Sequence, residues 1–199
     1  MKKTLITTAM AAVLGFAMFA PTVASANDGT ITFNGEITDR NCIITGGGAA
    51  TGIGDITVKL PTVSASALPQ DGATAGNTPF SLVLSGPNCT DGKTAALWVE
   101  TNQTPALDTS TNALRNQKSG GATNVEVRML NAANNQPILL GINGYVVNGQ
   151  QIIAANNQPA AIIAGNTATL SYVAQYLAVG AAPTPGLVTT YLTYSMQYN

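Results

Sequence analysis

Apolar and polar residues alternate along much of the 199-residue chain, with the period of two that is typical of β-strands. The alternation is cleanest in residues 27–41, where one face carries Gly29, Ile31, Phe33, Gly35 and Ile37. The same pattern predicts further strands over 56–60, 80–85, 95–101, 124–130, 144–149, 167–179 and 187–199. No amphipathic helical period of any length occurs after residue 26, so we expect an all-β protein.

Within these strands the alternation also assigns side chains to faces. The residues expected to face inward include Phe80, Leu82, Leu84, Val125, Val127 and Met129. Glu126 and Arg128 are expected on the outer surface, and Trp98, the only tryptophan, is expected in the core. In the last segment one face is lined by Val188, Leu192, Tyr194, Met196 and Tyr198.

Turn-forming residues separate the strands. The glycine-rich stretch 43–54 is interpreted as a loop, and 61–79 as a long connection anchored by Leu68. The sequence AANNQP occurs twice, at 132–137 and 154–159, and two copies predict a repeated turn between strands rather than a solenoid. An Asn-Gly pair at 148–149 predicts a hairpin.

About eight to ten short strands with turns between them favour a two-sheet, immunoglobulin-like sandwich. After residue 26, the chain both begins and ends with a strand that has an apolar face. Uncovered strand edges of this kind are a pairing liability unless pairing is their purpose. The question is therefore whether the cover for 27–41 belongs to the same molecule or to another one.

Residues 1–26 have the form of an export signal: Lys2 and Lys3, an apolar run, and Ala24-Ser25-Ala26, which resembles a signal-peptidase site. We expect cleavage there, leaving one domain of soluble, exported protein. Without Lys2 and Lys3 the remaining chain has six basic and nine acidic residues and no histidine. This balance does not suit a nucleic-acid partner.

The sequence also argues against an enzyme or a cofactor. No nucleophile stands with a base at a recognisable spacing, and the scattered carboxylates form no acid and base pair. The glycine-rich stretch has no Lys-Ser/Thr after it, and Gly86 lies one residue too far from Gly92-Lys93-Thr94 for a phosphate-binding loop. We expect no metal site and no cofactor.

The two cysteines, Cys42 and Cys89, both lie in the exported part of the chain. In an oxidising compartment two thiols most simply form one intrachain disulfide. A metal site would need further ligands that the sequence lacks, and a cysteine nucleophile would need a histidine base. The cysteines follow two predicted strands, which suits a bridge between neighbouring strands.

Four stretches together resemble the chaperone-usher pilins, specifically type 1-like major fimbrial subunits. They are GTITFNGEITDRNC from Gly29, LSGPNC ending at Cys89, VEVRMLNA in mid-chain, and SYVAQYLAVGAAPTPG before the final YLTYSMQYN. The resemblance covers essentially all of residues 27–199, and it depends on the order and spacing of the four stretches rather than on any single motif.

The resemblance implies an incomplete immunoglobulin-like β-sandwich, 42–199, whose groove is completed by a donor strand from a neighbouring subunit. The donor would be residues 27–41, with Ile31, Phe33 and Ile37 as groove-filling side chains and Gly35 as the small residue of the row. The strand 188–198 would form one groove wall and contact a periplasmic chaperone. The implied partners are further copies, related pilins, the chaperone and an outer-membrane usher, and the implied location is a surface fimbria that supports adhesion.

Two other readings stay open at this point. Residues 31–37 could be the first strand of a self-contained exported sandwich, which a period of two does not exclude. A tip adhesin or carbohydrate-binding module is the other alternative, although tip adhesins carry an extra N-terminal lectin domain and lack a donor extension.

Overall fold

The computed structural model describes residues 42–142, 146–147, 150–151 and 156–199. Regular structure there consists of strands and two short 3-10 turns, η1 (Ala65–Ala67) and η2 (Thr101–Gln103), so the expected all-β class is confirmed. No helix in this part of the chain is long and apolar enough to cross a membrane. The expected signal peptide, 1–26, and donor extension, 27–41, lie outside the described residues.

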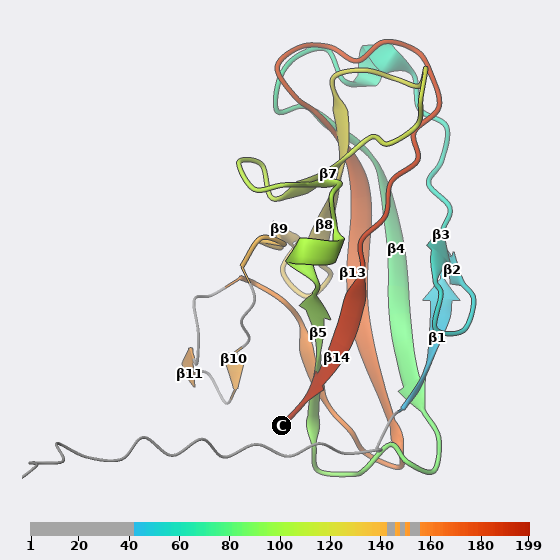
Figure 1. Ribbon diagram of the computed structural model, residues 1–199, viewed down its shortest axis with the longest axis vertical. Coiled ribbons are helices and arrows are strands. Elements are labelled where there is room, and N and C mark those ends of the chain that lie inside the picture. Colours follow the sequence, from blue (N-terminus) through green and yellow to red (C-terminus); the bar gives the residue numbers. More distant parts are fainter. Residues whose placement is uncertain (1–41, 143–145, 148–149, 152–155) are drawn as a thin grey trace, which may run out of the picture. The chain divides into compact units, whose positions relative to one another are not determined.

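The larger sheet is built around two long antiparallel strands, β4 (Thr74–Ser85) and β13 (Thr167–Ala178) (Figure 1). β1 (Ile43–Gly48) pairs with the other side of β4, and β8 (Val125–Asn131) with the other side of β13. The sheet continues through β7 (Ala113–Arg115) to β6 (Leu107–Asp108), and the short β9 (Gln136–Pro137) also pairs with β8.

The smaller sheet has three strands in the order β12 (Ala160–Ile162), β5 (Thr94–Val99) and β14 (Tyr194–Tyr198). Two further pairs are β2 (Ala50–Thr51) with β3 (Thr57–Val58), and β10 (Val146–Val147) with β11 (Gln150–Gln151). The last pair leaves two residues between its strands, as the Asn-Gly hairpin signal predicts.

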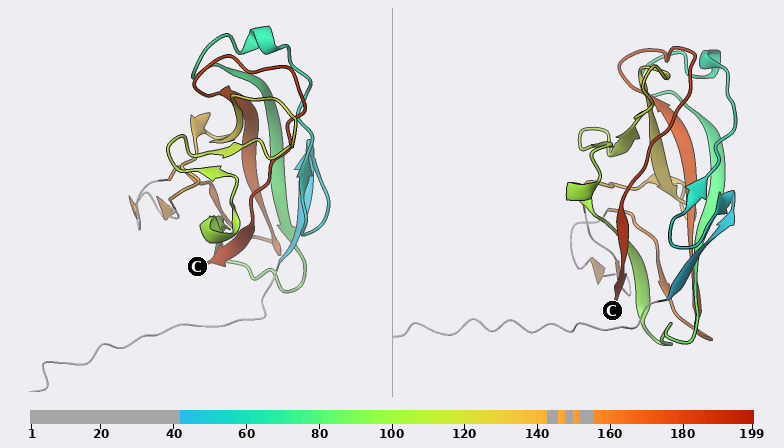
Figure 2. Two further views of the ribbon diagram at one scale, coloured as in Figure 1. Left: turned by 45° about the horizontal axis from the view of Figure 1, so that its top comes forward. Right: turned by 45° about the vertical axis from the view of Figure 1, so that its right-hand side comes forward.

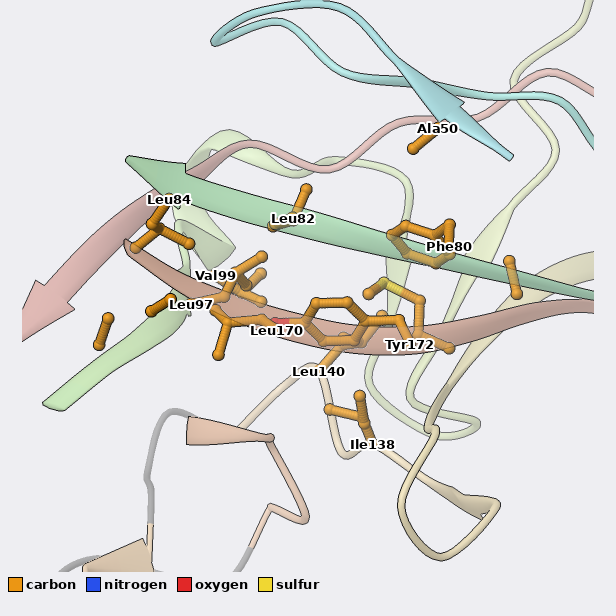
Figure 3. Close-up of a cluster of buried hydrophobic side chains, with 14 of the residues drawn as sticks. Ala50, Phe80, Leu82, Leu84, Leu97, Val99, Ile138, Leu140, Leu170 and Tyr172 are labelled. Atoms are coloured by element: carbon orange, nitrogen blue, oxygen red, sulfur yellow. The ribbon is translucent and has the colours of Figure 1, made fainter. Parts of the chain in front are cut away.

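The core lies between the two sheets (Figure 3). The rings of Phe80 on β4 and Tyr172 on β13 stack with centroids 5.2 Å apart, and Leu97 and Val99 face them from β5. The inward positions predicted on β4 and β8 are buried, as expected from their period of two. The result is an immunoglobulin-like sandwich that is incomplete, because β14 has a sheet neighbour on one side alone among the described strands.

The prediction that 43–54 is a loop was wrong, because much of this stretch is β1 and β2. A Cβ atom on Gly46 would lie 2.6 Å from the backbone nitrogen of Thr51, so glycine is needed there because backbone approaches backbone. Gly48, Gly52 and Gly54 have positive φ values of 66°, 110° and 69°, which glycine adopts without strain.

Three other expectations need correction. β4 begins at Thr74, so the connection before it is shorter than 61–79. Trp98 is half-buried and lies on the face of β5 opposite Leu97 and Val99, outside the core between the sheets. Glu126 was expected on the surface, and it is 4% exposed.

The two AANNQP copies form matching turns in their described residues. The backbone N–H of Gln136 donates to Asn134 Oδ1, and that of Gln158 donates to Asn156 Oδ1, each at 3.0 Å. The residue between them is left-handed in both copies, with φ of 55° at Asn135 and 60° at Asn157. The predicted repeated turn is confirmed, since asparagine tolerates this conformation better than other non-glycine residues.

Candidate functional site

One edge of β14 lacks a strand partner among the described residues. Hydrogen bonds show which residues turn toward β5: Asn199 and Thr94 exchange two at 2.9 and 2.8 Å, and the Glu100 N–H donates to Thr193 O at 2.9 Å. Because backbone groups alternate in direction along a strand, the intervening residues turn theirs away from β5. These residues are Tyr194, Met196 and Tyr198.

The edge of β1 that faces away from β4 is covered along only part of its length. Gly46 N–H donates to Gly52 O at 3.0 Å, and Gly54 N–H donates to Ile44 O at 2.9 Å. The same alternation turns the backbone groups of Cys42 toward this edge. Residues 52–54 therefore cap the Gly46 end, while the Cys42 end is open to another strand.

Between these two edges lies a groove of about 730 Å³. Figures 1 and 2 show β14 beside β5, and β1 along the edge of β4 that faces away from β13. The groove is lined from the β1 side by Cys42, Ile44, Gly54, Asp55 and Ile56, and from the C-terminal segment by Tyr191, Leu192, Thr193, Tyr194, Ser195, Met196 and Tyr198. Both walls thus present strand backbone and apolar side chains to the same space.

Of the five residues expected on the groove wall, four line the groove: Leu192, Tyr194, Met196 and Tyr198. Val188 packs against the core but is not among the lining residues. It precedes β14, in a stretch without an assigned strand, where Leu187 O and Thr189 O accept from the Ala122 and Gln117 N–H groups. The five expected donor residues, Gly29, Ile31, Phe33, Gly35 and Ile37, lie outside the described residues.

Sequence reasoning missed the opposite wall of the groove. Cys42, Ile44 and residues 54–56 line it, yet 43–54 had been interpreted as a loop. The strand predicted over 56–60 rests on the alternation of Ile56 and Val58, whose side chains pack against the core. Glycines interrupt the pattern before residue 56, so an edge strand with little side-chain periodicity was interpreted as a loop.

A disulfide fixes the end of this wall. Cys42 and Cys89 are bonded, with Cα atoms 4.5 Å apart, and both residues are buried. The bond joins the residue before β1 to the connection between β4 and β5. The disulfide therefore fixes the open end of β1 to the connection between β4 and β5.

Two tyrosine hydroxyls cross the groove from β14. Tyr194 Oη donates to Gly54 O at 2.6 Å, and the Cys42 N–H donates to Tyr198 Oη at 3.4 Å. Burial raises the pKa of both phenols, although the Cys42 amide partly offsets this at Tyr198. Both hydroxyls therefore remain protonated at neutral pH.

The groove offers little chemistry beyond strand pairing. In the part of the chain that the structure describes, Asp55 is the one carboxylate that lines it, and no group of three or more His, Cys, Asp or Glu side chains is placed to hold a metal ion. These residues do not form a catalytic or cofactor-binding arrangement. They form two open strand edges, to which an added strand can pair.

Comparison with known proteins gives the family of the chain. The family model described as FimA, type-1 fimbrial protein, A, matches residues 60–199. The chain is 40% identical over 181 residues to the major fimbrial subunit SMF-1 of Stenotrophomonas maltophilia, covering 90% of this chain and 98% of that protein. It is 37% identical over 190 residues to the F17 fimbrial protein of Escherichia coli, covering 94% and 96%.

Among solved structures, the P pilus rod subunit PapA is similar at a TM-score of 0.48 and 18% identity, over 80% of this chain and 99% of that one. The sequence relatives span nearly the whole chain and are fimbrial subunits by name. The chain therefore belongs to the type-1 fimbrial protein family, and it is a structural subunit of a surface fimbria and not an enzyme.

Proposed function

We propose that this chain polymerises by donor-strand exchange, in which residues 27–41 of one copy fill the groove of the next. The observation that carries the proposal is the pair of open edges. Cys42 on one side, and alternate residues of β14 on the other, turn backbone groups toward the same groove. A single extended segment placed there would pair with both edges at once.

The alternation of the proposed donor suits such a position. Ile31, Phe33 and Ile37 would turn toward the core and Gly35 would leave room in the row. Burying each large side chain is worth roughly 1.5 to 3 kcal/mol, and the added backbone hydrogen bonds increase the stabilisation. A joint of this strength would hold two subunits together without a covalent link.

The proposed contact also explains how a fibre would grow. Donor and acceptor are different surfaces of one chain, so the contact between copies is heterologous and does not close on itself. Each added copy would carry a new donor or a new groove. Copies of this chain and related pilins would therefore extend the fibre, and the fibre would support adhesion of the cell that carries it.

Before assembly the groove would need a temporary cover, because an open strand edge promotes unwanted pairing. We assign this role to a periplasmic chaperone that lends its own strand and contacts the segment from Val188 to Tyr198. An outer-membrane usher would then exchange that strand for the donor of the next subunit. Cleavage of residues 1–26 as a signal peptide would precede both steps.

The test places one acidic residue on either face of the donor. Phe33→Asp should abolish fibres seen by electron microscopy, because the carboxylate would have to enter an apolar groove. The matched control, Thr32→Asp, changes the neighbouring position on the opposite face and should leave fibres intact. Fibres of normal length from Phe33→Asp, or from a chain that lacks 27–41, would refute the donor role.

A further inference from the structure

The two tyrosine hydroxyls that cross the groove occupy positions that an incoming strand would need. By the alternation along β1, the Cys42 N–H is one of the backbone donors at the open edge, and it already donates to Tyr198 Oη at 3.4 Å. The Tyr198 hydroxyl, from the opposite wall, thus occupies the place that a backbone carbonyl of an incoming strand would take.

The second contact ties the cap of β1 to the same wall. Gly54 donates through its N–H to Ile44 O and accepts from Tyr194 Oη at 2.6 Å. The segment 52–54 is therefore held by β1 on one side and by Tyr194 on the other. Since both partners line the groove, this short hydrogen bond spans it.

We propose that these two contacts form a hydroxyl latch, defined as Tyr194 with Gly54 and Tyr198 with Cys42, which must open before a donor strand enters. The latch closes the groove with side-chain hydrogen bonds while no strand is present. Its opening therefore limits the rate at which a subunit captures a donor. This inference rests on the proposed donor-strand function.

The strength of the two contacts suits a latch that an incoming strand can open. Neutral hydrogen bonds contribute modestly to stability in water, and the bond at 2.6 Å has better geometry than the one at 3.4 Å. The released Cys42 N–H does not stay unpaired, because the backbone of the donor can pair with it. The exchange replaces side-chain contacts by strand pairing.

Tyr176 supplies a matched control outside the groove. Its hydroxyl donates to Pro61 O at 3.2 Å, and it is not among the residues that line the groove. Replacing it by phenylalanine removes the same kind of tyrosine–carbonyl hydrogen bond as at Tyr194 without touching the latch. A difference between the two variants therefore reports the contact across the groove and not the loss of a tyrosine hydrogen bond in general.

The experiment measures capture of a fluorescent peptide of residues 27–41 by the purified full chain, in stopped flow. We expect Tyr194→Phe to speed capture by about fivefold and Tyr198→Phe by about twofold, in proportion to the quality of each hydrogen bond. Tyr176→Phe should capture the peptide at the rate of the unaltered chain. All variants carry the same N-terminal extension, so competition from it affects each equally.

Amide hydrogen exchange at Cys42 provides a second measurement. Tyr198→Phe should raise the exchange rate of this N–H, and added peptide should lower it again in every variant. Equal capture rates for the unaltered chain, Tyr194→Phe and Tyr198→Phe would overturn the latch while leaving donor-strand exchange in place. A failure of the unaltered chain to capture any peptide would instead overturn the proposed function, and the latch with it.

Discussion

Tyr172 and Tyr176 lie on the same face of β13, but only the hydroxyl of Tyr176 has a hydrogen-bond partner. Tyr176 Oη donates to Pro61 O at 3.2 Å. Tyr172 is fully buried against Phe80, and its hydroxyl is unpaired among the described residues. Burial raises the pKa of Tyr172, so its phenol stays neutral across the physiological range.

The contrast predicts opposite effects of the same substitution. Tyr172→Phe removes a buried hydroxyl without a partner and should stabilise the fold by about 1 kcal/mol. Tyr176→Phe removes the existing hydrogen bond to Pro61 O and should destabilise the fold by about 1 kcal/mol. Urea unfolding of the two variants beside the unaltered chain measures both, and a Tyr172→Phe variant less stable than the unaltered chain would contradict the assignment.

The buried Glu126 predicts a dependence of stability on pH. Thr111 Oγ1 donates to Glu126 Oε2 at 2.5 Å, and Asp108, Arg115 and Arg128 are the charged groups around it. Burial raises the pKa of the Glu126 carboxyl above its ordinary value, since desolvation and the Asp108 charge outweigh Thr111 and Arg115. Folding therefore disfavours the ionised form.

For a carboxyl whose pKa is raised on folding, the cost is absent below the pKa of the unfolded chain and complete above the pKa of the folded chain. Glu126→Gln keeps an oxygen that accepts from Thr111 and cannot ionise. It should raise the melting temperature at pH 7, and this gain should shrink as the pH falls toward 4. A gain of the same size at both pH values would show that the charge of Glu126 is not its source.

Period-two alternation located the strands whose side chains form the core. It failed where burial depends on which segments cover the outer face of a sheet or on which face of a strand is the inner one. β4, β8 and β13 were found because their inward positions carry large apolar residues. The alternation gave no warning that Glu126 is covered, since burial of an outward-facing residue depends on what packs over the sheet. Trp98 shows the same limit, because size and hydrophobicity do not state which face of β5 is the inner one.

The sequence predicted one wall of the groove and missed the other. Its β14 wall was predicted from the row ending at Tyr198, because that row has large apolar side chains. The β1 wall was missed, since Gly46 marks a close approach of two backbones and the glycines at 46–48 carry no side-chain pattern. The latch was beyond sequence reasoning as well, because its hydrogen bonds join residues 140 and 156 positions apart.

The pair formed by Asn134 and Asn157 predicts a stabilising role for the sequence repeat. Asn134 Nδ2 donates to Asn157 Oδ1 at 2.7 Å, and Asn157 Nδ2 donates to Gln136 O at 2.9 Å. Asn157→Gly retains the left-handed backbone and loses these contacts, so we expect a loss of about 1 to 3 kcal/mol. Asn157→Ala should cost about 1 kcal/mol more, because alanine is strained at a φ of 60°.

Thermal unfolding of the two Asn157 variants separates the contributions of contact and backbone. As a control, Asn135→Gly changes the left-handed asparagine of the other copy, whose exposed side chain makes no hydrogen bond with the described residues. Equal stability for Asn157→Gly and the unaltered chain would show that the repeated turns do not support each other through their side chains.

The disulfide between Cys42 and Cys89 predicts a link between stability and the groove. It closes a loop with a sequence separation of 47, and loss of this constraint in the unfolded chain should cost about 4 kcal/mol on the chain-entropy model. The double variant Cys42→Ala with Cys89→Ala avoids a free thiol. We expect its urea midpoint to fall well below that of the unaltered oxidised chain.

The same variant should bind the 27–41 peptide more weakly, because Cys42 forms the open end of the β1 wall and the disulfide holds it in place. Peptide binding in turn should restore part of the lost stability by mass action, since the unfolded chain has no groove. The two effects are measured by fluorescence anisotropy and by urea unfolding with and without peptide. An unchanged peptide affinity in a clearly destabilised variant would mean that β4 and residues 52–54 alone hold the β1 wall in position.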